Sequence, residues 1–115
     1  MLVVEDDDDA RNILVSLLTY SGAFVSATAT AAAALDIMSQ VRADVVICDV
    51  NLSDHDALWL IAEVRRQPGD PPPFIAVSSQ DYDEVEMQQA GFLTSLVKPV
   101  RHDLMVSRIL AAVGR

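Results

Sequence analysis

Short apolar runs alternate with longer amphipathic stretches along the whole chain. Runs rich in β-branched side chains are typical of strands, and they predict strands over 2–4, 24–27, 45–48, 74–77 and 95–97. The clearest is Val45-Val46-Ile47-Cys48, which no polar residue interrupts. An uninterrupted apolar strand indicates burial on both faces, as in a parallel sheet.

The stretches between these runs carry apolar residues at helical spacing and predict helices over 8–21, 30–40, 56–67, 82–90 and 101–113. Gly22, Gly91 and the proline-rich segment 68–73 end three of them. The expected apolar faces are Ile13, Leu14, Leu17 and Leu18 in the first helix, Leu58, Leu60, Ile61 and Val64 in the third, and Leu104, Met105, Ile109, Leu110 and Val113 in the last.

Strands and helices that alternate in this way predict an α/β fold, a single doubly wound (βα)5 domain with a five-stranded parallel sheet. Right-handed crossovers place helices on both faces of such a sheet. Ligands then bind at the carboxyl ends of the strands. The residues that follow each strand are therefore the first candidates for a functional site.

Composition narrows the class of protein. The chain has 115 residues, 51% of them hydrophobic and 22% charged, which favours one folded domain over 1–115 rather than disorder. We expect no transmembrane segment, no signal peptide and no output domain within it. The single cysteine, Cys48, excludes an internal disulfide framework and a cysteine zinc site, and it fits a reducing, cytoplasmic setting.

Charge disfavours two classes of partner. The chain has 17 acidic against 8 basic residues and a formal net charge of −9. Lysine and arginine supply most of the affinity for phosphate backbones and anionic membranes, so we expect no direct contact with nucleic acid and none with a membrane. The position of the acids is more informative, because five of them, Glu5 to Asp9, directly follow the first strand.

Polar residues follow four of the predicted strands: Glu5 and Asp6, then Asp49, then Ser78, then Lys98. Two like charges about 4 Å apart repel by roughly 4 kcal/mol at an effective dielectric near 20, so converging carboxylates need a cation. Magnesium suits hard oxygen ligands combined with phosphate oxygens. A lysine and a serine hydroxyl can stabilise a phosphoryl group, and an aspartate beside magnesium can act as a nucleophile toward phosphorus.

Other motifs fail on spacing. Asp49-x-Asn51-x-Ser53 has the opening of an EF-hand calcium loop, but Asp54 stands where glycine is needed and Leu60 where glutamate is needed. No Gly-x-Gly-x-x-Gly or Gly-Lys-Ser/Thr motif supports nucleotide binding. A small aspartyl-phosphate phosphohydrolase is disfavoured, because Asn51 replaces the second aspartate of the haloacid dehalogenase pattern Asp-x-Asp.

Four motifs together resemble the receiver domain of two-component response regulators, the CheY-like family. They are VVEDD at 3–7, ICDVNLSDHDAL at 47–58, VSS at 77–79 and VKP at 97–99. The resemblance covers essentially the whole chain. It implies a flavodoxin-like sheet with strand order 2-1-3-4-5.

The same resemblance implies a Mg²⁺ site. Asp6 matches the direct metal ligand, and Glu5 matches the acid that acts on the metal through water. Asp49 matches the phosphoacceptor, which is also a ligand. Asn51 matches the position whose backbone carbonyl completes the metal shell.

Two further residues match the groups that bind the phosphoryl oxygens. Ser78 corresponds to the switch Thr/Ser, and Lys98 to the invariant lysine, whose bond to Pro99 is expected to be cis. Ser95 departs from the pattern, because the family usually has Tyr, Phe or His there. Ser53 and Ala57 also depart from it in the loop after Asp49.

By resemblance, the chain is expected to accept a phosphoryl group on Asp49 from a sensor histidine kinase or phosphotransfer protein. Phosphorylation would switch a surface that binds a downstream protein or a fused output domain. Homodimerisation through the face of the fourth helix, fifth strand and fifth helix is one possible result. Such a module assists its own phosphorylation and dephosphorylation but is not an enzyme that turns over an external substrate. The alternative, suggested by Ser95 and the altered loop, is a receiver-like binding module that signals without phosphorylation.

Overall fold

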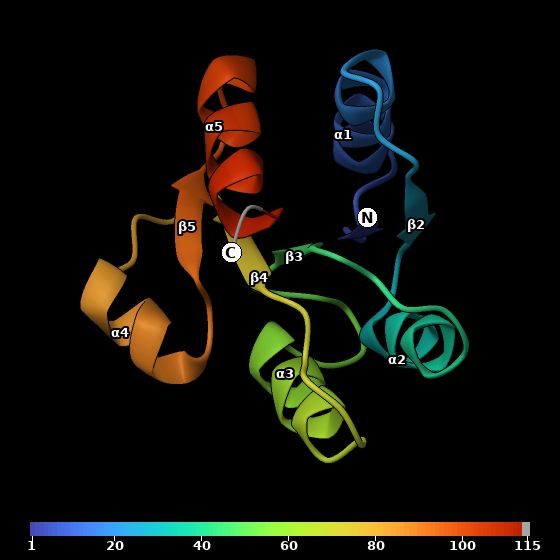
Figure 1. The fold of residues 1–115 in the computed structure, drawn as a ribbon. Coiled ribbons are helices and arrows are strands. Elements are labelled where there is room, and N and C mark those ends of the chain that lie inside the picture. The colour runs from blue at the N-terminus through green and yellow to red at the C-terminus, as the bar shows by residue number, and fades with distance from the viewer. Residues whose placement is uncertain (114–115) are drawn as a thin grey trace.

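The computed structural model describes residues 1–113, in which strands and helices alternate from the first strand to the last helix (Figure 1). The elements are β1 (Leu2–Val4), α1 (Asp8–Tyr20), β2 (Ser26–Thr28), α2 (Ala31–Gln40), β3 (Val46–Asp49), α3 (Ala57–Arg65), β4 (Phe74–Ser78), α4 (Glu84–Ala90), β5 (Thr94–Val97) and α5 (His102–Val113). Among these residues, no helix has the length and apolar character that a membrane crossing needs.

The sheet has five strands in the order β2-β1-β3-β4-β5, and all neighbouring strands are parallel. This confirms the predicted fold class and strand order. α1 and α5 lie on one face of the sheet, and α2, α3 and α4 lie on the other, with α4 at the β5 edge (Figure 1). Each strand therefore ends at the same edge of the molecule.

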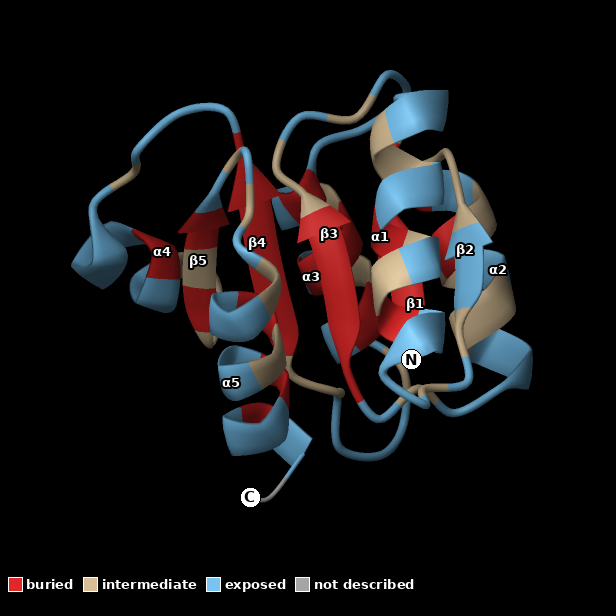
Figure 2. Cartoon of the chain, turned by 90° about the horizontal axis from the view of Figure 1, so that it is seen from above, coloured by how far each residue is buried: buried red, intermediate tan, exposed pale blue. Residues whose placement is uncertain are grey.

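Two apolar cores flank the sheet because successive strand residues point to opposite faces. Val46 and Cys48 belong to the core under α2 and α3, whereas Val45 and Ile47 belong to the core under α1 and α5. β1, β3 and β4 are buried almost throughout, while β2 is mostly exposed (Figure 2). The uninterrupted run at 45–48 is thus explained by burial on both faces, as predicted.

The second strand was predicted two residues too early. Phe24 is 94% exposed, and the strand runs over Ser26–Thr28, which pair in register with Leu2–Val4. At the edge of a sheet, backbone pairing with the neighbour can place a strand over residues whose side chains are not apolar. α4 likewise begins at Glu84 rather than residue 82, because the side chain of Asp83 caps it by accepting from the Val85 N–H.

The predicted apolar helix faces were too wide. Leu14 and Leu18 of α1 are buried, but Ile13 is 59% exposed; Leu58 of α3 and Leu110 of α5 are also exposed. The same holds for Leu104 and Val113. A helix on a flat sheet contacts it through a narrow stripe, so residues beside the stripe stay in solvent.

Candidate functional site

Three carboxylates meet at the carboxyl edge of the central strands. Val4 of β1 pairs with Cys48 of β3, so the residues that follow, Glu5 and Asp49, lie side by side. One carboxylate oxygen from each of Glu5, Asp6 and Asp49 lies within 4.8 Å of the other two. The convergence predicted from the strand ends is therefore confirmed as geometry.

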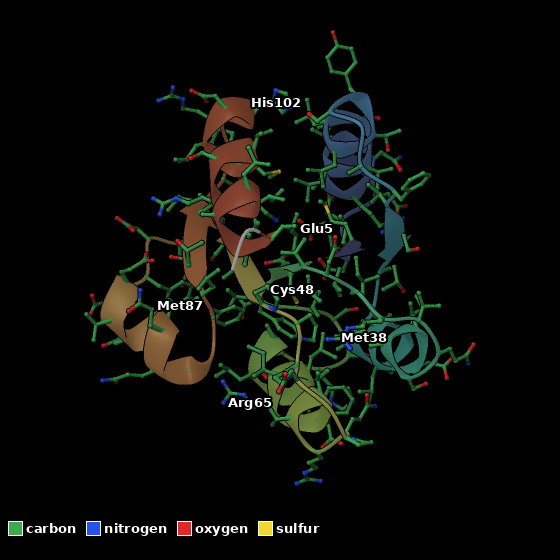
Figure 3. The ribbon with its side chains drawn as sticks, in the orientation of Figure 1. Glu5, Met38, Cys48, Arg65, Met87 and His102 are labelled. Atoms are coloured by element: carbon green, nitrogen blue, oxygen red, sulfur yellow. The ribbon has the colours of Figure 1, made fainter. Side chains whose placement is uncertain are left out.

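Glu5 is the most deeply buried of these acids, with only 1% of its surface exposed. Figure 3 shows it between the helices that cover the sheet. Its Oε1 accepts a hydrogen bond from the ammonium of Lys98, and its Oε2 accepts from the Asp7 N–H at 3.4 Å. A buried carboxylate is tolerated only when it is paired, and Lys98 supplies the pairing charge.

Lys98 connects Glu5 to Asp49. Its Nζ lies 3.4 Å from Oδ2 of Asp49, and its bond to Pro99 is cis, as expected from the resemblance. Burial alone would lower the pKa of this ammonium, but the hydrogen bond to Glu5 and the charge of Asp49 outweigh it and raise the pKa. Lys98 is therefore a fixed positive charge beside the Asp49 carboxylate.

One lysine does not neutralise three carboxylates. Desolvation by burial, followed by the hydrogen bond and the charge of the neighbouring Glu5, raises the pKa of Asp6 above its ordinary value. Asp6 remains partly accessible, and so does Asp49, whose side chain is 13% exposed. Clustered, hard oxygen donors that solvent can reach are the set that Mg²⁺ prefers, so these residues fit the ion that the resemblance implies.

Asn51 and Ser78 lie at the rim of this cluster. The Asn51 N–H donates to Oδ1 of Asp49 at 3.3 Å. Ser78 is 3% exposed, and its hydroxyl accepts from the Gln80 N–H at 3.1 Å while its carbonyl accepts from the Lys98 N–H at 2.8 Å. Among residues 1–113, no hydrogen bond joins Ser78 to Asp49, so the role of Ser78 stays a prediction.

Asp7 and Ser95 lie close to the cluster in sequence, but their side chains form hydrogen bonds with the ends of helices. Asp7 caps α1 by accepting from the Ala10 N–H at 2.7 Å. The Ser95 hydroxyl donates to Glu84 at 3.2 Å, and the Thr94 hydroxyl donates to the same carboxylate at 3.0 Å. The first residue of α4 is thus hydrogen-bonded to β5 through the position where the family usually has an aromatic ring.

Sequence reasoning missed two residues around the site. Arg11 of α1 donates to the backbone carbonyl of Glu5 at 3.0 Å. Asp54, in the loop after Asp49, accepts from the N–H groups of Ala31 and Ala32 at 3.0 Å each, the first two of α2, whose N-cap residue is Thr30. Only the spacing of Arg11 from Asp8, three residues along a helix, gave a local signal.

Comparison with known proteins agrees with this geometry. The model of the family described as response regulator receiver domain matches residues 1–110. The transcriptional regulatory protein YxdJ of Bacillus subtilis is 28% identical over 115 residues, which are all of this chain and 50% of YxdJ. The chain therefore spans about half the length of that relative.

Two solved structures extend the likeness. A putative response regulator from Chloroflexus aurantiacus superimposes with a TM-score of 0.91 and 28% identity, over 99% of this chain and 96% of that one. The receiver domain of the sensor histidine kinase PA1611 from Pseudomonas aeruginosa, described with a magnesium ion in its active-site cleft, gives 0.88 and 25% over 99% and 96% of the two chains. This chain belongs to the response regulator receiver domain family of two-component systems.

Proposed function

We propose that the chain accepts a phosphoryl group on Asp49 from a phosphohistidine of a sensor histidine kinase or phosphotransfer protein. One observation carries the proposal: the Asp49 carboxylate reaches solvent, lies 3.4 Å from the Lys98 ammonium, and shares a 4.8 Å cluster with Glu5 and Asp6. This combination offers a nucleophile, a fixed cation and oxygen ligands in one place.

The same cluster is our candidate Mg²⁺ site. Asp6 and Asp49 would hold the ion directly, Glu5 through water, and Asn51 through its backbone carbonyl. Bound there, Mg²⁺ would neutralise charge on the phosphoryl oxygens. The hard oxygen donors support this assignment, as does the magnesium described for the PA1611 receiver domain.

The remaining groups act on the transferring phosphoryl group. An oxygen of Asp49 forms a bond to phosphorus while the bond from phosphorus to the histidine nitrogen breaks, and the imidazole keeps that electron pair. Lys98, held in place by Glu5, stabilises the negative charge that is transferred. The Ser78 hydroxyl accepts from the Gln80 N–H and can donate its own proton to a phosphoryl oxygen.

Phosphorylation adds charge at the sheet edge and biases the surface that binds a partner. That partner is a downstream protein or a fused output domain, and a second copy of the chain could use the same face. The face of α4, β5 and α5 exposes Val85, Val97 and Leu104, at 57%, 45% and 39%, which supports a protein-binding role. In this proposal the 1–115 domain is a phosphoacceptor, not an enzyme that turns over an external substrate.

The test is phosphorylation by radiolabelled acetyl phosphate in the presence of Mg²⁺. The native chain should become labelled, and the Asp49→Asn variant should not. Asp36→Asn, which removes an exposed carboxylate on α2, is the matched control and should be labelled normally. Labelling of Asp49→Asn at the native rate would disprove the assignment.

A second candidate function is a receiver-like module that binds its partner without phosphorylation. The hydrogen bonds from Thr94 and Ser95 to Glu84 favour it, because they already fix α4 on β5. Beryllofluoride with Mg²⁺ mimics the phosphoryl group, and Trp59 fluorescence can follow the response. A change would support phosphorylation, whereas no response at millimolar Mg²⁺ would favour the second candidate.

A further inference from the structure

Arg11 bridges the run of acids that begins at Glu5. It lies in the first turn of α1, and its side chain is only 21% exposed. Nη1 donates to the backbone carbonyl of Glu5 at 3.0 Å, while Nη2 pairs with the carboxylate of Asp8. One guanidinium therefore ties the end of β1 to the start of α1.

The carbonyl that Arg11 holds belongs to the peptide unit joining Glu5 to Asp6. Both candidate metal-binding acids are attached to that unit, so its orientation sets the direction of both side chains. On the other side, the Glu5 N–H donates to the carbonyl of Thr28 at 3.0 Å. Together these two hydrogen bonds fix the backbone of Glu5 from α1 and from β2.

We infer that Arg11 is a positioning residue for the acidic pair Glu5 and Asp6, so that Mg²⁺ affinity depends on its guanidinium. The inference rests on the proposed function, and it makes a prediction opposite to that of charge alone. A positive charge near the cluster repels a divalent cation, so its removal should strengthen Mg²⁺ binding if Arg11 acted only by charge. If Arg11 acts by positioning, its removal should weaken Mg²⁺ binding.

The experiment is a calorimetric titration of the native chain and its variants with Mg²⁺ alone. Groups that orient metal ligands typically contribute about 10-fold or more to affinity, so Arg11→Gln should raise the Kd for Mg²⁺ by about 10-fold. Arg11→Lys keeps the charge and one donor and should rescue part of the loss. Arg66→Gln removes an arginine that is paired three residues away with Glu63 on α3, and it should leave the Kd unchanged.

A second measurement separates positioning from chemistry and from misfolding. Arg11 makes no hydrogen bond to Asp49 or Lys98 within residues 1–113, so labelling of Arg11→Gln by acetyl phosphate at saturating Mg²⁺ should recover the native rate. Urea unfolding without metal checks that Arg11→Gln is folded. If it is not, Arg11→Lys is the deciding variant, and its Kd for Mg²⁺ should be higher than that of the native chain.

Unchanged or tighter Mg²⁺ binding by Arg11→Gln overturns the inference while leaving the proposed function intact. Failure of the native chain itself to bind Mg²⁺ or to be labelled overturns the proposed function, and the inference with it.

Discussion

Replacing Lys98 by methionine should expose how strongly the fold depends on the pairing of Glu5. Glu5 is 1% exposed, and after the substitution the hydrogen bond from the Asp7 N–H, at 3.4 Å, is what remains for its carboxylate. Breaking a buried ion pair by removing one partner costs about 3–5 kcal/mol. Because 27% of the Lys98 side chain is exposed, solvent reaches this pair and we expect the lower end, about 3 kcal/mol.

Urea denaturation followed by Trp59 fluorescence, with chelator present, measures this loss. For an m-value of about 2 kcal/mol/M, the unfolding midpoint of Lys98→Met should fall by about 1.5 M. The control is Arg66→Met, which removes an arginine whose side chain is 77% exposed and should change the free energy of unfolding by less than about 0.5 kcal/mol.

Magnesium should partly restore the variant. A ligand at 10 times its Kd stabilises the folded state by about 1.4 kcal/mol. At its proposed site, Mg²⁺ would supply positive charge where Lys98 supplied it. Its stabilising effect should therefore be larger in Lys98→Met than in the native chain. A midpoint within about 0.3 M of the native value in chelator would refute the reasoning, because Glu5 would then not need its partner.

Four other substitutions test the packing and the helix ends of the fold. Asp54→Ala should cost about 1 kcal/mol because it removes the acceptor of the Ala31 and Ala32 N–H groups at the start of α2, where Thr30 remains the N-cap. The N–H groups of Ala31 and Ala32 outweigh desolvation and lower the pKa of Asp54 to about 2, so its contribution is complete above about pH 4. The difference in unfolding free energy between the native chain and the variant should shrink as pH falls from there toward 2. A difference that does not change with pH would contradict the stabilising role of the Asp54 carboxylate. Gly91→Ala should destabilise more than Gly69→Ala, although both have positive φ, +115° and +94°. A Cβ at Gly91 would lie 2.9 Å from Cγ2 of the buried Ile61, whereas a Cβ at Gly69 meets nothing within 4 Å. Phe24→Ser should leave the unfolding midpoint unchanged, because Phe24 is 94% exposed; a large loss would mean that it packs in solution.

The sequence predicted the parts of the fold that follow from side-chain periodicity. The run at 45–48 predicted β3, Val46–Asp49, to within one residue because burial on both faces leaves no polar position in that run. The second strand was misplaced because Ser26–Thr28 form an edge strand through backbone pairing, which leaves no hydrophobic pattern. Ile13 was expected in the core because periodicity indicates a face but not how much of that face the sheet covers.

In the candidate site, too, some residues could be assigned from the sequence and others could not. Glu5, Asp49 and Lys98 could be brought together from sequence because parallel strands end at one edge, and a residue that follows a strand must lie there. Arg11 and Asp54 could not be assigned, since their partners are backbone groups. A donor side chain can bind any free carbonyl and an acceptor side chain any free N–H, and only the folded chain determines which backbone group is near.

The buried thiol next to Asp49 offers a built-in probe of this site. Cys48 has none of its surface exposed, and burial followed by the charges of Asp49 and Glu5 raises its pKa (Figure 3). An alkylating reagent can therefore reach it only when the helices α2 and α3, which cover it, move off the sheet, and Cys48 is the one cysteine of the chain. Its alkylation rate reports on opening of this core in the unmodified protein, one residue from the carboxylate at which metal and phosphoryl group are proposed to bind.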